Sequence, residues 1–166
     1  ELELLAESFW PGPLTVVLTK KDKVPDLVTA GLPSVGVRMP SHSFIREVLQ
    51  QSGLFLAAPS ANPFGYLSPT SAAHVRDSLG SKAPYIVDGG NCKHGIESTI
   101  LGLQNPHEPV LLRPGPISRE KLEAVLGLKV NVPCKGFEED DGVNQIAPGN
   151  LKKHYSPHTP MDLFPN

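Results

Sequence analysis

The sequence predicts an α/β domain, because segments with strand patterns and segments with helix patterns are mixed along most of its length. Short β-branched runs such as Leu14–Thr19 and Thr99–Leu103 indicate strands, whereas the apolar spacing of residues 43–52 indicates a helix. The chain has 166 residues, of which 39% are hydrophobic, and this is enough for one domain with a core. The 15 glycines and 18 prolines predict a folded protein that is rich in loops.

The N-terminal part is expected to form a helix, a turn and two strands. Residues 1–8 have helical spacing, and Trp10–Pro13 must turn because its two prolines interrupt both helices and β-ladders. Strands are predicted at Leu14–Thr19 and at Ser34–Arg38. Because the chain opens in a helical pattern without a methionine, we expect the sequence to be incomplete at its N-terminus.

The middle of the chain is expected to alternate helices and strands. The helix over residues 43–52 is predicted to end at Gly53, because glycine favours the left-handed conformation found at helix ends. A buried strand is predicted at Leu54–Ala58, and a further strand at Tyr85–Asp88. Between them, Ser68 followed by a proline predicts the N-cap of another helix.

A strand pair and a short helix are predicted to complete the domain. Thr99–Leu103 and Pro109–Arg113 have the pattern of two strands joined by a polar loop. Ser118 predicts the N-cap of a helix that ends at Gly127. We therefore expect one domain over residues 1–132.

Beyond residue 132 the helix and strand patterns stop. Residues 133–157 are rich in glycine, proline and charged residues and lack sustained periodicity, so we interpret them as an interdomain linker. Residues 158–166 contain a short strand-like run, and we interpret them as the start of a truncated C-terminal domain.

Composition and charge narrow the class of protein. The net charge of -2 provides no broad basic surface for nucleic acids or anionic membranes, so an anionic ligand would need a local pocket. The 2 cysteines are too few for a disulfide framework, and no apolar run is long enough to span a membrane. These features predict a reducing compartment and a cytoplasmic location, with an organellar copy as the alternative.

Candidate binding residues follow or end the predicted strands. Ser60 and Asn62 come after the strand at Leu54–Ala58, where open α/β sheets bind ligands, and an ordinary turn is the alternative interpretation. Arg38 and Arg113 each end a strand. A guanidinium there offers paired donors to a carboxylate or phosphate, and a structural ion pair is the alternative.

Other familiar kinds of site are not supported by the sequence. It contains no standard glycine-rich phosphate motif and no G-x-S-x-G elbow, so a serine hydrolase built on Ser60 or Ser98 is not indicated. His154 and His158 lie four residues apart, but Pro157 interrupts the helix that would bring both to one metal ion. We predict no metal-ligating residues in this chain.

Several stretches together resemble the YrdC-like domain of threonylcarbamoyl-AMP synthases. They are Phe9–Thr15, Val35–His42, Ala58–Asn62 with Ser68–Thr70, Asp88–Gly90, Gly95–Ile100 and Leu112–Ile117. Pro148–Gly149 and His154–Pro157 further resemble the linker of the longer, two-domain synthases, which folds back over the active site. The resemblance implies a twisted mixed sheet flanked by helices and followed by an extended linker.

The resemblance also implies an activity, that of an L-threonylcarbamoyladenylate synthase. This nucleotidyltransferase joins L-threonine, bicarbonate or CO2, and ATP with Mg2+, and it releases pyrophosphate. The product serves threonylcarbamoyladenosine modification of tRNA, which implies the tRNA threonylcarbamoyl transferase machinery as a downstream partner and leaves contact with double-stranded RNA or tRNA open. No membrane partner is implied.

Roles for individual residues follow from the same resemblance. The threonine-binding residues it implies are Arg38, Ala58 and Ser98, and the ATP-binding residues are Ser34, Ser60, Asn62, Ser68, Arg113 and Tyr155. Ser60 and Asn62 belong to a Lys, Arg, Ser, Asn signature whose lysine and arginine would lie upstream of residue 1, so no catalytic residue is assigned. The segment around Tyr155 is expected to close over the nucleotide as a lid.

Two other functions remain open at this point. One is a carbamoyltransferase domain of the hydrogenase-maturation type, and the linker residues His154–Pro157 argue against it. The other is a non-catalytic module that binds double-stranded RNA, and the net charge of -2 argues against it.

Overall fold

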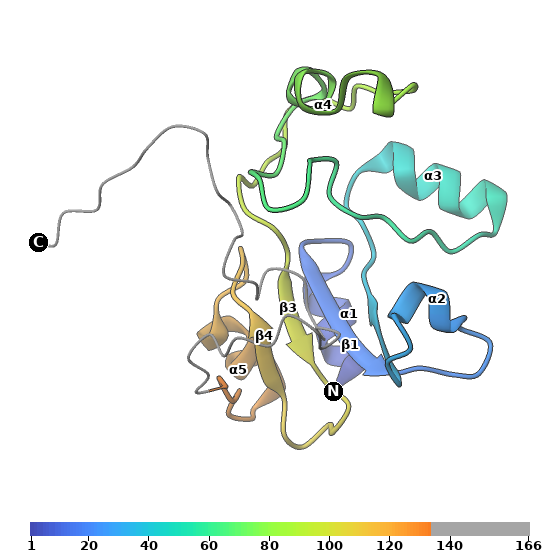
Figure 1. The fold of residues 1–166 in the computed structure, drawn as a ribbon. Helices are drawn as coiled ribbons and strands as arrows, with labels where there is room; N and C mark the ends of the chain where they lie inside the picture. The colour runs from blue at the N-terminus through green and yellow to red at the C-terminus, as the bar shows by residue number, and fades with distance from the viewer. Residues whose placement is uncertain (134–166) are drawn as a thin grey trace, which may run out of the picture. The chain divides into compact units, whose positions relative to one another are not determined.

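A computed structural model describes residues 1–133, which divide into two compact units (Figure 1). Within this range, unit 1 contains residues 1–58 and 96–133, and unit 2 contains residues 59–95. Apart from residue 133, the linker predicted at 133–157 lies outside the described residues, as does the domain start predicted at 158–166.

Unit 1 is built on a four-stranded mixed sheet with the strand order β2-β1-β3-β4. Its strands are β1 (Leu14–Thr19), β2 (Ser34–Val37), β3 (Thr99–Gly102) and β4 (Val110–Arg113). β1 pairs antiparallel with β2 and parallel with β3, and β3 pairs antiparallel with β4. The prediction of an α/β fold with a mixed sheet is therefore confirmed.

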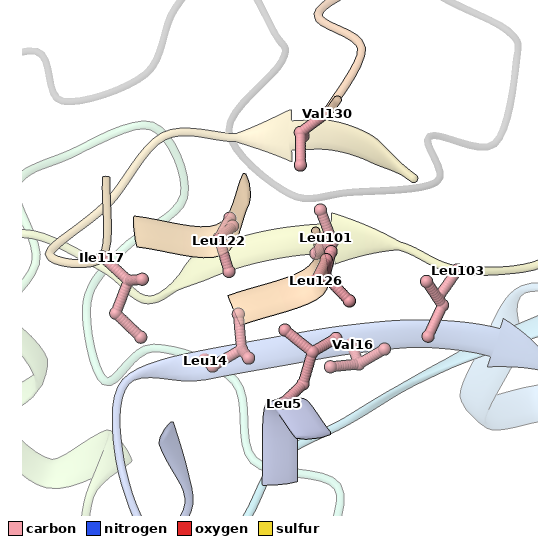
Figure 2. Packing of buried hydrophobic residues seen from close by; sticks show 9 residues of the cluster. All are labelled: Leu5, Leu14, Val16, Leu101, Leu103, Ile117, Leu122, Leu126 and Val130. Atoms are coloured by element: carbon pink, nitrogen blue, oxygen red, sulfur yellow. The ribbon is translucent and has the colours of Figure 1, made fainter. Parts of the chain in front are cut away.

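Two helices, α1 (Leu2–Phe9) and α5 (Arg119–Leu126), pack on one face of this sheet (Figure 1). Their buried side chains meet those of β1 and β3 in the main core, which Figure 2 shows. The members of this core are Leu5, Leu14, Val16, Leu101, Leu103, Ile117, Leu122, Leu126 and Val130. Full burial of a leucine stabilises a fold by about 1.5–3 kcal/mol, so this cluster is the main source of stability in unit 1.

Helix ends in unit 1 follow the local sequence signals. Ser118 Oγ accepts a hydrogen bond from Lys121 N at 3.4 Å and begins α5, and Gly127 ends that helix with φ 64°. Gly53, with φ 65°, ends α3 (Ser43–Ser52) in the same way. These predicted helix ends are confirmed, because a cap depends only on nearby residues. A short helix, α2 (Asp26–Thr29), was not predicted.

Two predicted strands are wrong. Leu54–Ala58 and Tyr85–Asp88 are not strands. Phe55, in the run predicted to be buried, is 97% exposed, and Tyr85 is 93% exposed. A strand requires a neighbour that satisfies its backbone N–H and C=O groups. The described part of the chain provides neither segment with such a neighbour.

Unit 2 contains one helix, α4 (Ala72–Leu79), followed by the short 3₁₀ helix η1 (Gly80–Lys82). The predicted N-cap at Ser68 is wrong, because Ser71 Oγ accepts a hydrogen bond from His74 N at 3.3 Å and so begins the helix later. None of the helices in the described residues is long and apolar enough to cross a membrane.

Candidate functional site

The loop before β1 is bonded to the start of β3 and to the chain after β2. Thr99 N donates to Pro13 O at 3.0 Å, and Gly12 N donates to Met39 O at 2.9 Å. A Cβ at Gly12 would lie 2.3 Å from Phe9 O, so this turn accepts only glycine. Segments that are distant in the sequence therefore meet at one end of β1.

The chain after β4 is fastened to the same place. Thr99 Oγ1 donates to Ile117 O and accepts from Ile117 N, both at 2.9 Å, and Thr99 is fully buried. A Cβ at Gly115 would lie 2.3 Å from Thr99 N and 2.7 Å from Glu97 O. Backbones can approach this closely only at a glycine, so the turn after β4 contacts residues 97–99 directly.

Arg113, the last residue of β4, binds the segment before β3 with its guanidinium. Nε and Nη2 donate to Ser98 O at 3.1 and 2.9 Å, and Nη2 also donates to Ser98 Oγ at 3.1 Å. Nη1 donates to Glu97 Oε2 at 2.5 Å, and the side chains of this ion pair are only 12% and 17% exposed. The planar guanidinium is thus held on two edges.

The Ser98 hydroxyl lies between Arg113 and a residue of β1. Ser98 Oγ is 2.8 Å from Thr15 Oγ1, and Ser98 is 6% exposed. Because strand side chains alternate, Thr15 faces away from the main core that contains Leu14. We call Thr15, Glu97, Ser98 and Arg113 the Arg113 cluster.

A local irregularity between β3 and β4 accompanies this arrangement. Their pairing shifts register between Ile100 and Leu101, so that Ile100 pairs with Arg113. Leu112 packs with Val17 and Ile100 on the sheet face opposite the main core. The next residue, Arg113, extends its side chain to Ser98. Such irregularities change the direction of nearby side chains.

Arg38 directly follows β2 and is exposed. Val37 pairs with Val16, so extending this register by one residue sets Arg38 across from Thr15, at the end of the sheet that holds the Arg113 cluster. Within residues 1–133, no hydrogen bond or ion pair of the Arg38 guanidinium is formed. This arginine can therefore present its paired donors to a carboxylate.

Not all predicted residues of unit 1 gather here. Ser34 pairs with Thr19 at the opposite end of β2, and the four residues to Arg38 correspond to about 13 Å along a strand. Ala58 is exposed in the segment that follows α3. The structure thus brings Ser98 and Arg113 together, sets Arg38 at the same end of the sheet, and leaves Ser34 at the other end.

Ser60, Asn62 and Ser68 belong to unit 2. Asn62 Nδ2 donates to Pro63 O at 3.0 Å and to Tyr66 O at 3.1 Å, which holds the turn between them. Asn62 Oδ1 is buried and has no hydrogen-bond partner among the described residues. Ser60 is exposed and Ser68 is half-buried. Asn62 therefore combines a structural role with an acceptor that a ligand can use.

Tyr155, the remaining predicted site residue, lies outside the described residues. Thr15 and Glu97 belong to the Arg113 cluster but were not predicted as site residues. Both lie in stretches that carried the family resemblance, Phe9–Thr15 and Gly95–Ile100, and this was the signal that could have found them. Across residues 1–133, no three His, Cys, Asp or Glu side chains are grouped to hold a metal ion.

Family models match almost the whole chain. The model Sua5/YciO/YrdC, described as "Telomere recombination", matches residues 1–115. A second model, the C-terminal domain of threonylcarbamoyl-AMP synthase, matches residues 117–166. This second match begins just before α5, inside unit 1.

Individual relatives agree with these matches. The chain is 44% identical to the threonylcarbamoyl-AMP synthase of Pyrococcus abyssi over 158 residues, which are 95% of this chain and 45% of that protein. It is 45% identical to the synthase of Bacillus subtilis over 160 residues, which are 96% of this chain and 45% of that protein. The chain thus spans less than half the length of these relatives.

A solved structure has the same fold. The crystal structure of Pyrococcus abyssi Sua5 complexed with L-threonine matches with a TM-score of 0.83 and 42% sequence identity. The match covers 94% of this chain and 45% of the Sua5 chain.

Proposed function

The chain belongs to the Sua5/YciO/YrdC family, and on this basis we propose that the protein is an L-threonylcarbamoyladenylate synthase. The observation that carries this proposal is the exposed Arg38 guanidinium, which has no partner within residues 1–133 and follows β2 at the end of the sheet that holds Ser98. A site for threonine requires such a cation for the carboxylate and polar groups for the rest of the amino acid.

The reaction proposed has two bond-forming steps. The threonine amine attacks CO2 and loses a proton, which forms a carbamate. A carbamate oxygen then attacks the α-phosphorus of ATP, and the bond to the departing pyrophosphate breaks. Because two anions must meet, the protein would act mainly by positioning them and by directing N–H and O–H donors at the charge that develops.

We assign threonine to Arg38, Ala58 and Ser98. Arg38, which is exposed, would bind the carboxylate with two parallel hydrogen bonds. The Ser98 hydroxyl has three hydrogen-bonding positions, of which Arg113 and Thr15 use two. The third position is left for a polar group of the substrate.

We assign ATP to a second set of residues. They are Ser34, Ser60, Asn62, Ser68, Arg113 and Tyr155. Asn62 Oδ1 is the member with the best support from geometry, because a buried acceptor without a partner is satisfied by a ligand donor. Mg2+ bound to the ATP phosphates would neutralise part of the charge on the leaving pyrophosphate.

The proposal also covers the chain beyond residue 132 and the fate of the product. We propose that residues 133–157 form a linker whose Tyr155 closes over the nucleotide, and that residues 158–166 begin the next domain. The product would be consumed by a tRNA threonylcarbamoyl transferase in the cytoplasm. Closure would protect the mixed anhydride, which water hydrolyses readily.

The test is a synthesis assay with the full-length protein, L-threonine, bicarbonate, ATP and Mg2+, in which product is identified by mass and pyrophosphate release is followed. We expect release to depend on threonine. Arg38→Ala should raise the KM for threonine by about 10- to 100-fold and the KM for ATP far less, as expected for loss of a charge-assisted hydrogen bond. Arg46→Ala, which removes an exposed arginine from α3, is the matched control. Pyrophosphate release without threonine would reject the proposed function.

A further inference from the structure

We propose that Thr15 and Glu97 are positioning residues for the reaction proposed above, on which this inference rests. Thr15 orients the Ser98 hydroxyl, and Glu97 orients the Arg113 guanidinium. Neither residue is assigned a contact with substrate. Their effect passes through the two side chains that they hold.

The contact between Thr15 and Ser98 limits the directions that the Ser98 hydroxyl can take. Its oxygen accepts from Arg113 Nη2 at 3.1 Å and is 2.8 Å from Thr15 Oγ1. With these two positions occupied, the third is fixed in direction and is available to a ligand. A valine at position 15 would keep the shape of the side chain but would release the hydroxyl to rotate.

One residue of β2 near Thr15 lacks a side chain, namely Gly36, which pairs with Val17. A Cβ at Gly36 would lie 3.2 Å from Thr15 Cγ2, which is closer than most real contacts. Gly36 therefore leaves Thr15 free of a side chain that would press on its methyl group.

The ion pair with Glu97 orients the Arg113 guanidinium, as Thr15 orients the Ser98 hydroxyl. Glu97 accepts at the Nη1 edge, whereas the Ser98 carbonyl accepts from Nε and Nη2 on the other edge. The two edges together fix the plane of the guanidinium, and the low exposure of both side chains strengthens the pairing. Loss of the Glu97 charge would loosen one edge and leave the Ser98 contacts in place.

The alternative is that these contacts only stabilise the fold. The two roles differ in what they predict for each substrate. If Thr15 acts through Ser98, its loss affects threonine, and if Glu97 acts through Arg113, its loss affects ATP. A purely structural role would lower stability without separating the two substrates.

The first experiment measures binding of threonine and of a non-hydrolysable ATP analogue to the full-length Thr15→Val variant by titration calorimetry, together with steady-state KM values. We expect threonine binding to weaken by about 5- to 10-fold and analogue binding to change less than about twofold, because one neutral hydrogen bond is lost. Thr15→Ser should restore threonine binding. Thr19→Val, at the exposed end of β1, is the matched control.

A double-mutant cycle makes this test specific. In a Ser98→Ala background the hydroxyl that Thr15 orients is gone, so Thr15→Val should weaken threonine binding no further. An equal effect of Thr15→Val in both backgrounds would overturn the role assigned to Thr15.

The second experiment uses Glu97→Gln with Glu108→Gln, an exposed residue of the β3–β4 loop, as its control. Binding of the ATP analogue should weaken by about 5- to 10-fold, and threonine binding should change less. A Glu97→Gln variant that melts at a lower temperature but binds both ligands normally would overturn the role assigned to Glu97.

Ligand titrations test the positioning roles of Thr15 and Glu97, and the synthesis assay tests the proposed function, so the two can fail separately. If the full-length protein binds both ligands but makes no threonylcarbamoyl-AMP, the proposed function fails and the calorimetric titrations still decide the positioning roles. If it binds neither ligand, both the proposed function and this inference are overturned.

Discussion

Arg113 and Arg38 terminate the two outer strands of the same sheet, yet their surroundings differ in almost every respect. Arg113 is part of β4, is 12% exposed and binds Glu97 and Ser98 through three of its nitrogens. Arg38 follows β2, is exposed and forms no hydrogen bond or ion pair within residues 1–133. In both cases a proline follows within two residues, so the sequence offered the same two interpretations for each.

One residue type thus serves two purposes at this end of the sheet. A guanidinium that is already bonded on two edges is rigid and can hold neighbouring groups in place. A guanidinium that is exposed and unpaired within the described residues keeps its donors for a ligand, at the cost of side-chain entropy when the ligand binds. Arg113 therefore forms an ion pair that fixes its position beside the nucleotide proposed above, whereas Arg38 keeps all its donors for the threonine carboxylate.

The largest difference is expected when each arginine is replaced by methionine. Arg113→Met should lower the free energy of unfolding by about 3 kcal/mol, because it removes a largely buried ion pair with Glu97 together with the hydrogen bonds to Ser98. Arg38→Met should change this free energy by less than about 0.5 kcal/mol. Denaturant unfolding of the full-length protein measures both values. Equal losses for the two variants would contradict the comparison.

A somewhat smaller loss of unfolding free energy is expected at Gly115, which contacts the backbone of Glu97 and Ser98 in the Arg113 cluster. Gly115→Ala should cost about 2–3 kcal/mol of unfolding free energy, because the new Cβ would press on the backbone at 97–99. Gly95→Ala is the matched control, since a Cβ there meets nothing within 4 Å. Thermal unfolding of the two variants side by side provides the measurement. A normal melting temperature for Gly115→Ala would show that this turn can move away.

A loss of about 1–2 kcal/mol is expected for Thr99→Val, which removes both hydrogen bonds to the Ile117 backbone but keeps the volume of the side chain. Thr99→Ser retains the hydroxyl and should lose less. Urea unfolding compares the pair. Equal losses of unfolding free energy for the two variants would contradict this prediction, because they would show that the hydroxyl contributes no more than the methyl group that serine lacks.

The smallest effect is expected at Glu120, in the first turn of α5 and outside the Arg113 cluster. Its own backbone N–H and the Ser118 hydroxyl lower the pKa of the Glu120 carboxyl below its ordinary value of 4.5. A lowered pKa in the folded state contributes stability above the unfolded pKa, and this contribution disappears as the pH falls through the folded pKa. Glu120→Gln should therefore melt slightly below wild type at neutral pH and equally in acid. A difference in melting temperature that stays the same from neutral to acid pH would contradict the assignment of this stability to the Glu120 carboxylate.

Much of unit 1 could be predicted from sequence because its signals are local. The strand pair at β3 and β4, the helix α3 and the caps at Ser118 and Gly127 all depend on residues that are neighbours in the chain. The candidate residues Arg38, Ser98 and Arg113 were found because they lie in recognisable stretches at strand ends. The convergence of Thr15 and Glu97 on the same place was not found, because it joins β1 to a segment 83 residues away.

The sequence by itself determined most of the helices, the ends at Gly53, Ser118 and Gly127, and the strands whose partners lie within the described chain, but not α2 or the start of α4. Its hydrophobic patterns and caps act over a few residues, and a helix satisfies its own backbone groups. Only the tertiary structure decided which apolar runs become strands, as Leu54–Ala58 shows, because a strand is completed by a partner that its own residues do not specify. It also decided that Arg113 is bound and Arg38 is available, since that depends on where Glu97 and Ser98 lie after folding.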